Sequence, residues 1–260
     1  MLFLRCPLIA PAALFTWVSL TLPAQAVVVT FQETGSYTTG ITQIRSDQTG
    51  NNYGADGNLI VGRTTAPATI RGLLSFSLAS IPAGSTINSI KLTLVTASAD
   101  ATSSSGAAVL NLYNLNGAFV EGTGTSSGTA STTSATWLRR DSSTWTSGGD
   151  FNSTVLSSKS INPVTVVAGA VQDFDTSASF VAAAQAALDG GTSLSLLLKL
   201  NDTDEGTNLR RAFFFNSDDF ATVANRPKLS IDYTPLPEPS AGLFTLLAGG
   251  LMLVCVQRRR

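Results

Sequence analysis

Any catalysis or ligand binding by this chain would depend mainly on carboxylates, guanidinium groups and aromatic rings. The 260 residues include no histidine and only two cysteines, Cys6 and Cys255, which stand near the two ends. Without histidine the chain lacks the commonest general base, the usual activator of a nucleophilic serine and the best zinc ligand. Thiol catalysis, disulfides and cysteine metal sites are excluded from everything between the two cysteines.

Basic side chains in or beside expected strands are the first candidates for binding. Guanidinium groups pair bidentately with carboxylates, so a row of them on one sheet face could bind uronic acids or sulfated sugars. The alternative is a solvated strand face with ordinary cross-strand ion pairs. Tryptophan rings could stack on sugar rings, or pack the rim of the fold. The candidate ligand-binding residues are Arg71, Trp137, Arg139, Trp145, Arg210 and Arg211.

Carboxylates gather in two short segments, "NDTDEG" and "NSDDF". Calcium prefers oxygen ligands from such loops, so Asp202, Asp204 and Asp218 are candidate ligands of a structural Ca²⁺, although an ordinary polar loop is the alternative. The spacing does not match an EF-hand. A glycosidase would need a pair of carboxylates, and the glutamates Glu121 and Glu205 stand in no recognisable motif. We therefore predict no enzymatic activity and no other cofactor.

The first 26 residues read as an export signal. A positive charge at Arg5 precedes an apolar run at residues 8–22, and small residues at Ala24 and Ala26 follow it. This order predicts a secretory signal peptide that signal peptidase cuts after Ala26; an uncleaved anchor is the alternative.

Residues 235–260 form a second sorting segment. Residues 240–257 are apolar and just long enough to span a hydrocarbon core as a transmembrane helix, and the basic end is expected to stay cytoplasmic. The segment resembles a PEP-CTERM sorting signal, which implies transient anchoring in the inner membrane of a Gram-negative bacterium and cleavage by an exosortase. The residues that carry this resemblance are Pro237, Glu238, Pro239, Arg258, Arg259 and Arg260.

Between the two ends, residues 27–234 alternate apolar and polar side chains at a period of two. The pattern is clear in "IRGLLSFSL", "SIKLTLVT", "SLSLLLKL" and "PKLSIDY", and it predicts antiparallel strands with one solvated face. "AAVLNLYNL", "VTVVAGAVQDF" and "RRAFFFNS" are apolar enough for central strands. "TSASFVAAAQAALDGG" predicts one short helix with Phe180, Ala184 and Ala187 on one stripe. Residues 122–137 are low in complexity, which predicts a long flexible loop or a ligand-contacting one.

The same region resembles the DNRLRE-type, disaggregatase-related domain. The resemblance rests on "SDQTGNNYGADGNLIVG", "RGLLSFSLASIPAGSTINSIKLTL", "ATWLRRDSSTWTSGGDF" and "RPKLSIDY", which occur in that order between residues 41 and 233. It implies an all-β, jelly-roll-type β-sandwich in a secreted or cell-surface protein. Some members of that family bind anionic polysaccharides.

Residues 27–236 hold twelve Lys and Arg against sixteen Asp and Glu, a net charge of −4, and no clustered basic face. This excludes a nucleic-acid partner. We therefore expect an exported, non-catalytic cell-surface or matrix protein that binds polysaccharide, with exosortase and signal peptidase as partners during export. A self-associating matrix protein without glycan binding is the main alternative, and a polysaccharide-degrading enzyme is a minor one.

Overall fold

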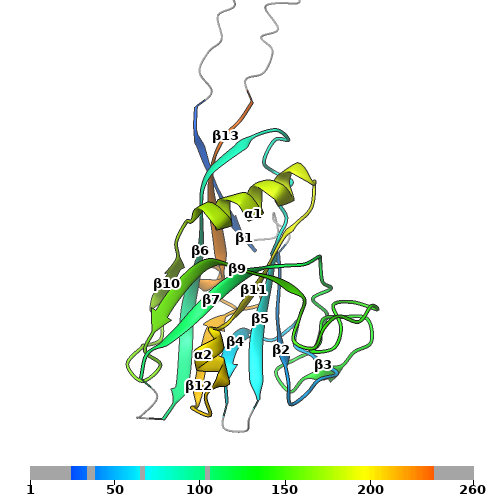
Figure 1. Ribbon diagram of the computed structural model, residues 1–260, viewed down its shortest axis with the longest axis vertical. Coiled ribbons are helices and arrows are strands. Elements are labelled where there is room, and N and C mark those ends of the chain that lie inside the picture. Colours follow the sequence, from blue (N-terminus) through cyan, green and yellow to red (C-terminus); the bar gives the residue numbers. More distant parts are fainter. Residues whose placement is uncertain (1–24, 34–38, 65–67, 103–105, 237–260) are drawn as a thin grey trace, which may run out of the picture. The chain divides into compact units, whose positions relative to one another are not determined.

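The structure is a computed structural model that describes residues 25–33, 39–64, 68–102 and 106–236 (Figure 1). Most of the predicted signal peptide and nearly all of the predicted sorting tail lie outside these residues. Within the described ranges, no helix combines the length and apolar character that crossing a bilayer requires.

Two antiparallel sheets share the long strand β6 (Thr86–Ala101). Sheet A has the order β1-β13-β6-β10 and uses the first half of β6. Its other strands are β1 (Val27–Gln32), β10 (Val171–Phe174) and β13 (Lys228–Thr234). The sandwich-like all-β class predicted from the alternation is confirmed, and the jelly-roll subtype stays a prediction.

Sheet B has the order β6-β12-β4-β5-β11-β7-β9, and β2 also pairs with β5. Its strands are β2 (Thr39–Arg45), β4 (Asn58–Arg63), β5 (Thr69–Phe76), β7 (Ala108–Leu115), β9 (Phe151–Ile161), β11 (Leu194–Leu200) and β12 (Arg211–Asn216). A separate short pair joins β3 (Asn51–Asn52) to β8 (Thr129–Ala130). The register brings Leu74 opposite both Leu196 and Ile41, so apolar positions of neighbouring strands share one face.

The main core is built by the inward halves of these alternating strands. Leu74 and Phe76 of β5 and Leu196 and Leu198 of β11 are fully buried in it, as the period of two predicts. Helix α1 (Ala178–Asp189) adds buried side chains to the same core and contacts β6, β9 and β11.

Helix α1 confirms the helix predicted from the alanine-rich segment. The Ser177 side chain accepts a hydrogen bond from the Phe180 backbone N–H at 3.0 Å, which satisfies one of the donors left open at a helix start. The chain leaves the helix at Gly190, whose N–H donates to the Ala186 carbonyl. A five-residue helix α2 (Asp202–Gly206) and a short 3-10 helix η1 (Val223–Asn225) were not predicted.

Part of the outer face of sheet B is buried too, which the alternation did not predict. Leu73 and Leu197 stand at positions that the alternation assigns to solvent, yet both are fully buried in a second hydrophobic cluster. The segment 116–150 covers them and contributes Trp145 to the same cluster. The predicted flexible loop is thus part of a layer held by hydrogen bonds, among them the one from the Ala135 N–H to the Val120 carbonyl at 2.7 Å.

One strand prediction needs correction, and two strands were missed. The apolar content of "VTVVAGAVQDF" predicted a central strand. Only Val171–Phe174 forms a strand, and it lies at the edge of sheet A. Val164 and Val167 are exposed in the turn before it, because a run of small and β-branched residues does not by itself fix burial. Strands β2 and β9 were not predicted.

Candidate functional site

Cations and aromatic rings alternate on the outer face of sheet B. Arg71 of β5 and Lys199 of β11 point to this side, next to rings from β7, β9 and the segment 116–150. We call the group the Arg71–Lys199 cluster; it consists of Arg71, Tyr113, Trp137, Phe151, Lys199, Asp202 and Glu205.

The Arg71 guanidinium lies between two rings. Its Cζ atom is 5.3 Å from the Trp137 ring centroid and 5.7 Å from that of Phe151, both within range of a cation–π contact. Nε and Nη2 donate to the two carboxylate oxygens of Glu205 at 3.0 and 2.8 Å. Nη1 donates to the Gly148 carbonyl at 2.9 Å. These contacts fix the guanidinium in one orientation.

Lys199 is a buried cation, with only 2% of its side chain exposed. Its Nζ lies 5.7 Å from the Tyr113 ring centroid and 5.9 Å from that of Phe151. Burial of a charge is costly unless partners compensate, and Lys199 has two. It pairs with Asp202 and lies 3.2 Å from the Glu205 Oε2 that also accepts from Arg71.

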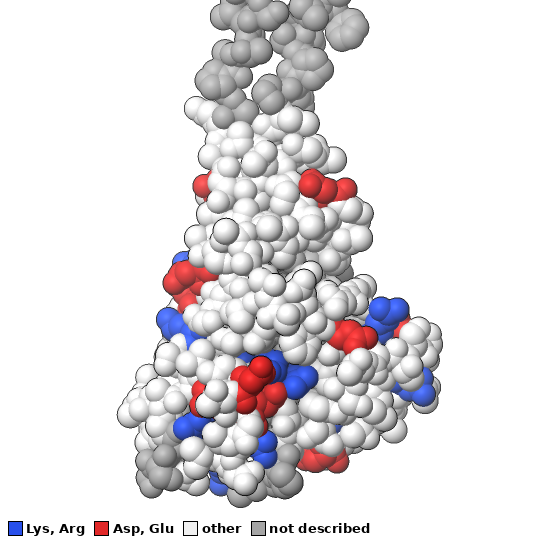
Figure 2. All heavy atoms as spheres, in the orientation of Figure 1, with Lys and Arg blue, Asp and Glu red and all other residues white. Residues whose placement is uncertain are grey.

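The carboxylates of the cluster come from α2, which follows β11 directly. Asn201 caps this helix by accepting from the Asp204 N–H at 2.7 Å. The hydrogen bond from Lys199, and then its charge, hold the pKa of Asp202 below its usual range. Figure 2 shows acidic and basic side chains next to each other in the region where Figure 1 places α2.

The structure brings together some of the predicted ligand-binding residues and separates others. Arg71 and Trp137 are in contact. Trp145 is 9% exposed and belongs to the second hydrophobic cluster, and its Nε1 donates to the Thr136 and Trp137 carbonyls at 3.2 Å. Trp145 therefore packs within the fold, which was one of the two roles predicted for the tryptophans.

The remaining arginines are engaged elsewhere. Arg211 pairs with Asp204 of α2, and Arg210 pairs with Asp100 of β6. Arg139 donates to the Ser142 carbonyl at 3.2 Å within its own loop. Ordinary ion pairs, the alternative to a basic row, therefore account for Arg210 and Arg211.

Sequence reasoning missed Phe151 and the role of Glu205. Phe151 begins β9, a run of mostly small polar residues in which Leu156 and Ile161 are buried. These two stand five positions apart, so no period of two marked the strand. Glu205 stands 134 positions from Arg71, and no local pattern announces a pair at that separation.

Gly148 controls how closely the backbone approaches the cluster. A Cβ atom there would lie 2.6 Å from the Arg71 Nη1 and 3.0 Å from Trp137 Cζ2, at a φ of +91°. Gly148→Ala is therefore expected to displace both side chains and to destabilise the fold by about 2–3 kcal/mol, strain included. Gly169→Ala is the matched control, because its φ is +82° and no atom lies within 4 Å of the added Cβ. Equal losses of melting temperature in both variants would show that Gly148 has no specific role.

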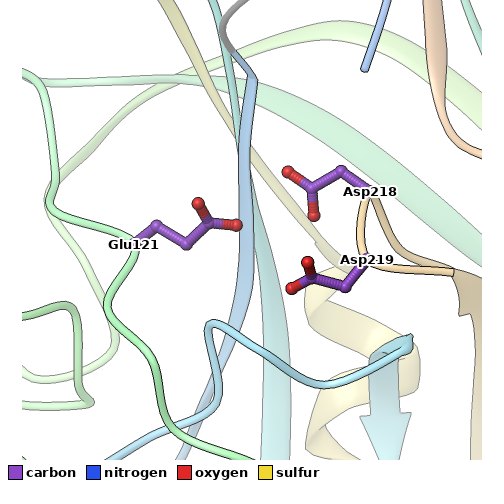
Figure 3. Close-up of side chains that lie close together, drawn as sticks. All are labelled: Glu121, Asp218 and Asp219. Atoms are coloured by element: carbon purple, nitrogen blue, oxygen red, sulfur yellow. The ribbon is translucent and has the colours of Figure 1, made fainter. Parts of the chain in front are cut away.

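A second group of carboxylates lies away from the cluster. Glu121, Asp218 and Asp219 have carboxylate oxygens within 4.8 Å of one another, and Figure 3 shows them turned toward each other. The predicted calcium ligands are therefore divided. Asp218 belongs to this group. Asp202 and Asp204 lie on α2, where Asp202 pairs with Lys199 and Asp204 pairs with Arg211.

Glu121 is expected to make stability depend on pH. Burial, and then the charge of Asp218, raise the pKa of Glu121 to about 9 from an ordinary 4.5. The folded state then holds a proton that the unfolded state releases, so the stability that Glu121 contributes is fully present below about pH 4.5 and is lost as pH rises to about 9. Thermal melts across this range should show a falling melting temperature.

Glu121→Gln is the control for this effect. The amide oxygen can still accept from the Ile41 N–H, which donates to Glu121 Oε1 at 2.7 Å. The variant is expected to flatten the pH dependence and to be more stable than the wild type at pH 8. An unchanged slope would assign the dependence to other groups.

A structural calcium stays a prediction, and these three carboxylates are the set to test. They supply three hard oxygen donors, and a divalent cation would favour the ionised form of Glu121. About 10 mM Ca²⁺ is expected to raise the melting temperature at pH 8 relative to EDTA, and Glu121→Gln to lose this gain. No calcium-dependent shift in the wild type would contradict the prediction.

Comparison with known proteins identifies one family that matches most of the chain. No curated protein matches the chain at a significant level. The model of carbohydrate-binding module family 96 matches residues 37–233, which include both hydrophobic clusters except Phe31 and every residue of the Arg71–Lys199 cluster. The chain therefore belongs to carbohydrate-binding module family 96.

Proposed function

We propose that this protein is an exported, non-catalytic glycan-binding protein and that the glycan binds at the Arg71–Lys199 cluster. The observation that carries the proposal is the half-buried ring of Trp137 held against the fixed guanidinium of Arg71. A ring in this setting offers an apolar surface to the C–H face of a pyranose. The polar groups beside it can donate to and accept from the sugar hydroxyls. Small-molecule sites usually combine an apolar lining with a few polar groups that fix the orientation of the ligand.

Affinity measurements test the binding. Full-length protein, solubilised in mild detergent, is titrated with neutral glucans, polyuronates and sulfated polysaccharides. Saturable binding of at least one class, weakened by Trp137→Ala, is expected. Absence of binding to all three classes would contradict the proposal.

The cellular setting follows from the predicted ends of the chain. We propose that signal peptidase removes residues 1–26, that the tail holds the protein briefly in the inner membrane, and that an exosortase releases it near Pro237-Glu238-Pro239. The DNRLRE-type and PEP-CTERM resemblances support a place at the cell surface or in an exopolysaccharide matrix. Mass spectrometry of protein recovered from the host tests this, because a mature chain that still ends in Arg260 would mean permanent anchoring.

A further inference from the structure

The Asn52 side chain holds together the two ends of the loop that precedes Trp137. Asn52 belongs to β3 (Figure 1) and is only 1% exposed. Its Nδ2 donates to the Glu121 carbonyl at 2.5 Å and to the Ala135 carbonyl at 2.9 Å. These carbonyls stand at the start and the end of the loop 121–135, so a single amide group fixes both ends.

Every hydrogen-bonding position of this amide is used. A primary amide offers two N–H donors and an oxygen that accepts two bonds. Both donors of Asn52 reach carbonyls of the segment 116–150, and its Oδ1 accepts from the Gly54 N–H at 3.1 Å and the Gly124 N–H at 2.9 Å. Leucine has a similar size but makes none of these bonds, and aspartate lacks both donors. Either replacement leaves buried backbone groups unsatisfied, which is costly.

Three glycines allow the two backbones to approach this closely. A Cβ atom at Gly122 would lie 2.3 Å from Asn52 Oδ1, and one at Gly124 would lie 1.9 Å from the Asn52 carbonyl oxygen. A Cβ atom at Gly54 would lie 2.4 Å from the Gly122 carbonyl oxygen. All three distances are shorter than the 3.0 Å below which real Cβ contacts essentially never occur. The glycines on both sides are therefore what gives Asn52 access to the loop.

The effect of Asn52 reaches Trp137 through the backbone. Ala135 is fully buried, and its carbonyl shares one planar peptide group with the N–H of Thr136. The bond from Asn52 therefore sets the orientation of this peptide group, directly before Trp137. On the other side, the Gly148 N–H donates to the Trp137 carbonyl at 2.8 Å. The indole of Trp137 thus projects from a backbone that is fixed both before and after it.

We propose that Asn52 is a positioning residue of the glycan site and that it orients the Trp137 ring through the Ala135 backbone. The proposal rests on the glycan-binding function proposed above. A binding group has to be held close to its productive geometry by the residues behind it, and a site whose supporting residues are loose loses affinity. Asn52 is too deeply buried to contact the sugar, so it acts through Trp137.

The test compares Asn52→Leu with Gln43→Met. Gln43 of β2 is the matched control, because it is also a buried amide: its Oε1 accepts from the Ile60 N–H at 2.5 Å, and its Nε2 donates to Asp56 at 3.4 Å. Both partners lie outside the segment 116–150. Each substitution replaces an amide by an apolar side chain of similar size, so both variants should have a lower melting temperature than the wild type.

Full-length protein in mild detergent is titrated with a neutral β-glucan, polygalacturonate and a sulfated galactan, well below the melting temperature of each form. Asn52→Leu is expected to weaken binding of the best of these polymers about tenfold, less than Trp137→Ala, because the ring is displaced rather than removed. Gln43→Met should stay within about a factor of two of the wild type. Amide hydrogen exchange at residues 135–137 should become about tenfold faster in Asn52→Leu alone.

The outcomes separate positioning from general stability and from glycan binding itself. An unchanged affinity in Asn52→Leu, or an equal loss in both variants, would overturn the positioning role and leave glycan binding intact. Binding of none of the three polymers by the wild type would overturn both proposals. Should Asn52→Leu fail to fold, Asn52→Asp decides, because it keeps the size and the acceptor oxygen and removes only the two donors. A wild-type affinity in that variant would count against the proposal in the same way.

Discussion

Trp137→Ala is expected to weaken glycan binding about 30-fold, or roughly 2 kcal/mol, the scale of a tryptophan hot spot. Two contributions are lost together. The ring no longer offers a stacking surface, and Arg71 loses one of the two rings that hold its guanidinium in place. Calorimetric titration with the best glycan ligand measures the loss directly.

Leu138→Ala is the control for this variant. Leu138 neighbours Trp137, is 40% exposed, and its contact with Trp145 is made by the backbone carbonyl, which alanine retains. We expect its affinity to stay within a factor of two of the wild type and its melting temperature to change little. If Leu138→Ala and Trp137→Ala reduce binding equally, the glycan site lies elsewhere on the molecule.

Trp145→Ala is expected to have the largest effect on stability, a loss of about 3–5 kcal/mol. The indole is buried in the hydrophobic cluster that also contains Ile44, Leu73 and Leu197, and it donates to two backbone carbonyls of its own loop. Alanine leaves a cavity and removes the donor that both carbonyls share. For a domain of this size the melting temperature should fall by roughly 10 °C.

The comparison of the two tryptophan variants separates packing from recognition. Trp137→Ala should lose binding with a modest loss of stability, and Trp145→Ala should lose stability first. Chemical denaturation of both variants measures the difference in unfolding free energy. A loss in Trp145→Ala below about 1 kcal/mol would show that the outer layer of sheet B contributes little to folding.

The alternation of apolar and polar residues predicted most of the fold. It identified β5, β6, β11 and β13, and the apolar content of "AAVLNLYNL" and "RRAFFFNS" identified β7 and β12. It also contained the signal for the second hydrophobic cluster, since Leu73 and Leu197 interrupt the polar side of β5 and β11. The layer that covers them, built from low-complexity sequence, has no periodic pattern and could not be predicted.

The candidate site was only partly predictable. Arg71 and Trp137 were identified from residue type and position, but their contact depends on how the segment 116–150 folds back over sheet B. The partners of the cations could not be predicted at all. Glu205 reaches Arg71 and Lys199 only because β11 lies beside β5 in the sheet and α2 follows β11.

Glu121 and Asp218 illustrate the same limit. One lies in the segment 116–150 and the other follows β12, and only the assembled fold brings their carboxylates together. Asp218 was predicted to bind calcium together with Asp202 and Asp204, which the fold assigns to separate ion pairs.

Under the export proposed above, the pairing of β1 with β13 would determine when the first sheet can be completed. Val27 pairs with Tyr233, so the first strand of the domain forms its hydrogen bonds with the last. A chain that crosses a membrane from its N-terminus presents β1 long before β13 emerges, and contacts this far apart in sequence form slowly. In an exported chain, β1 would therefore stay without its β13 partner until translocation reaches residue 234. A holding factor outside the membrane would be needed most during that interval.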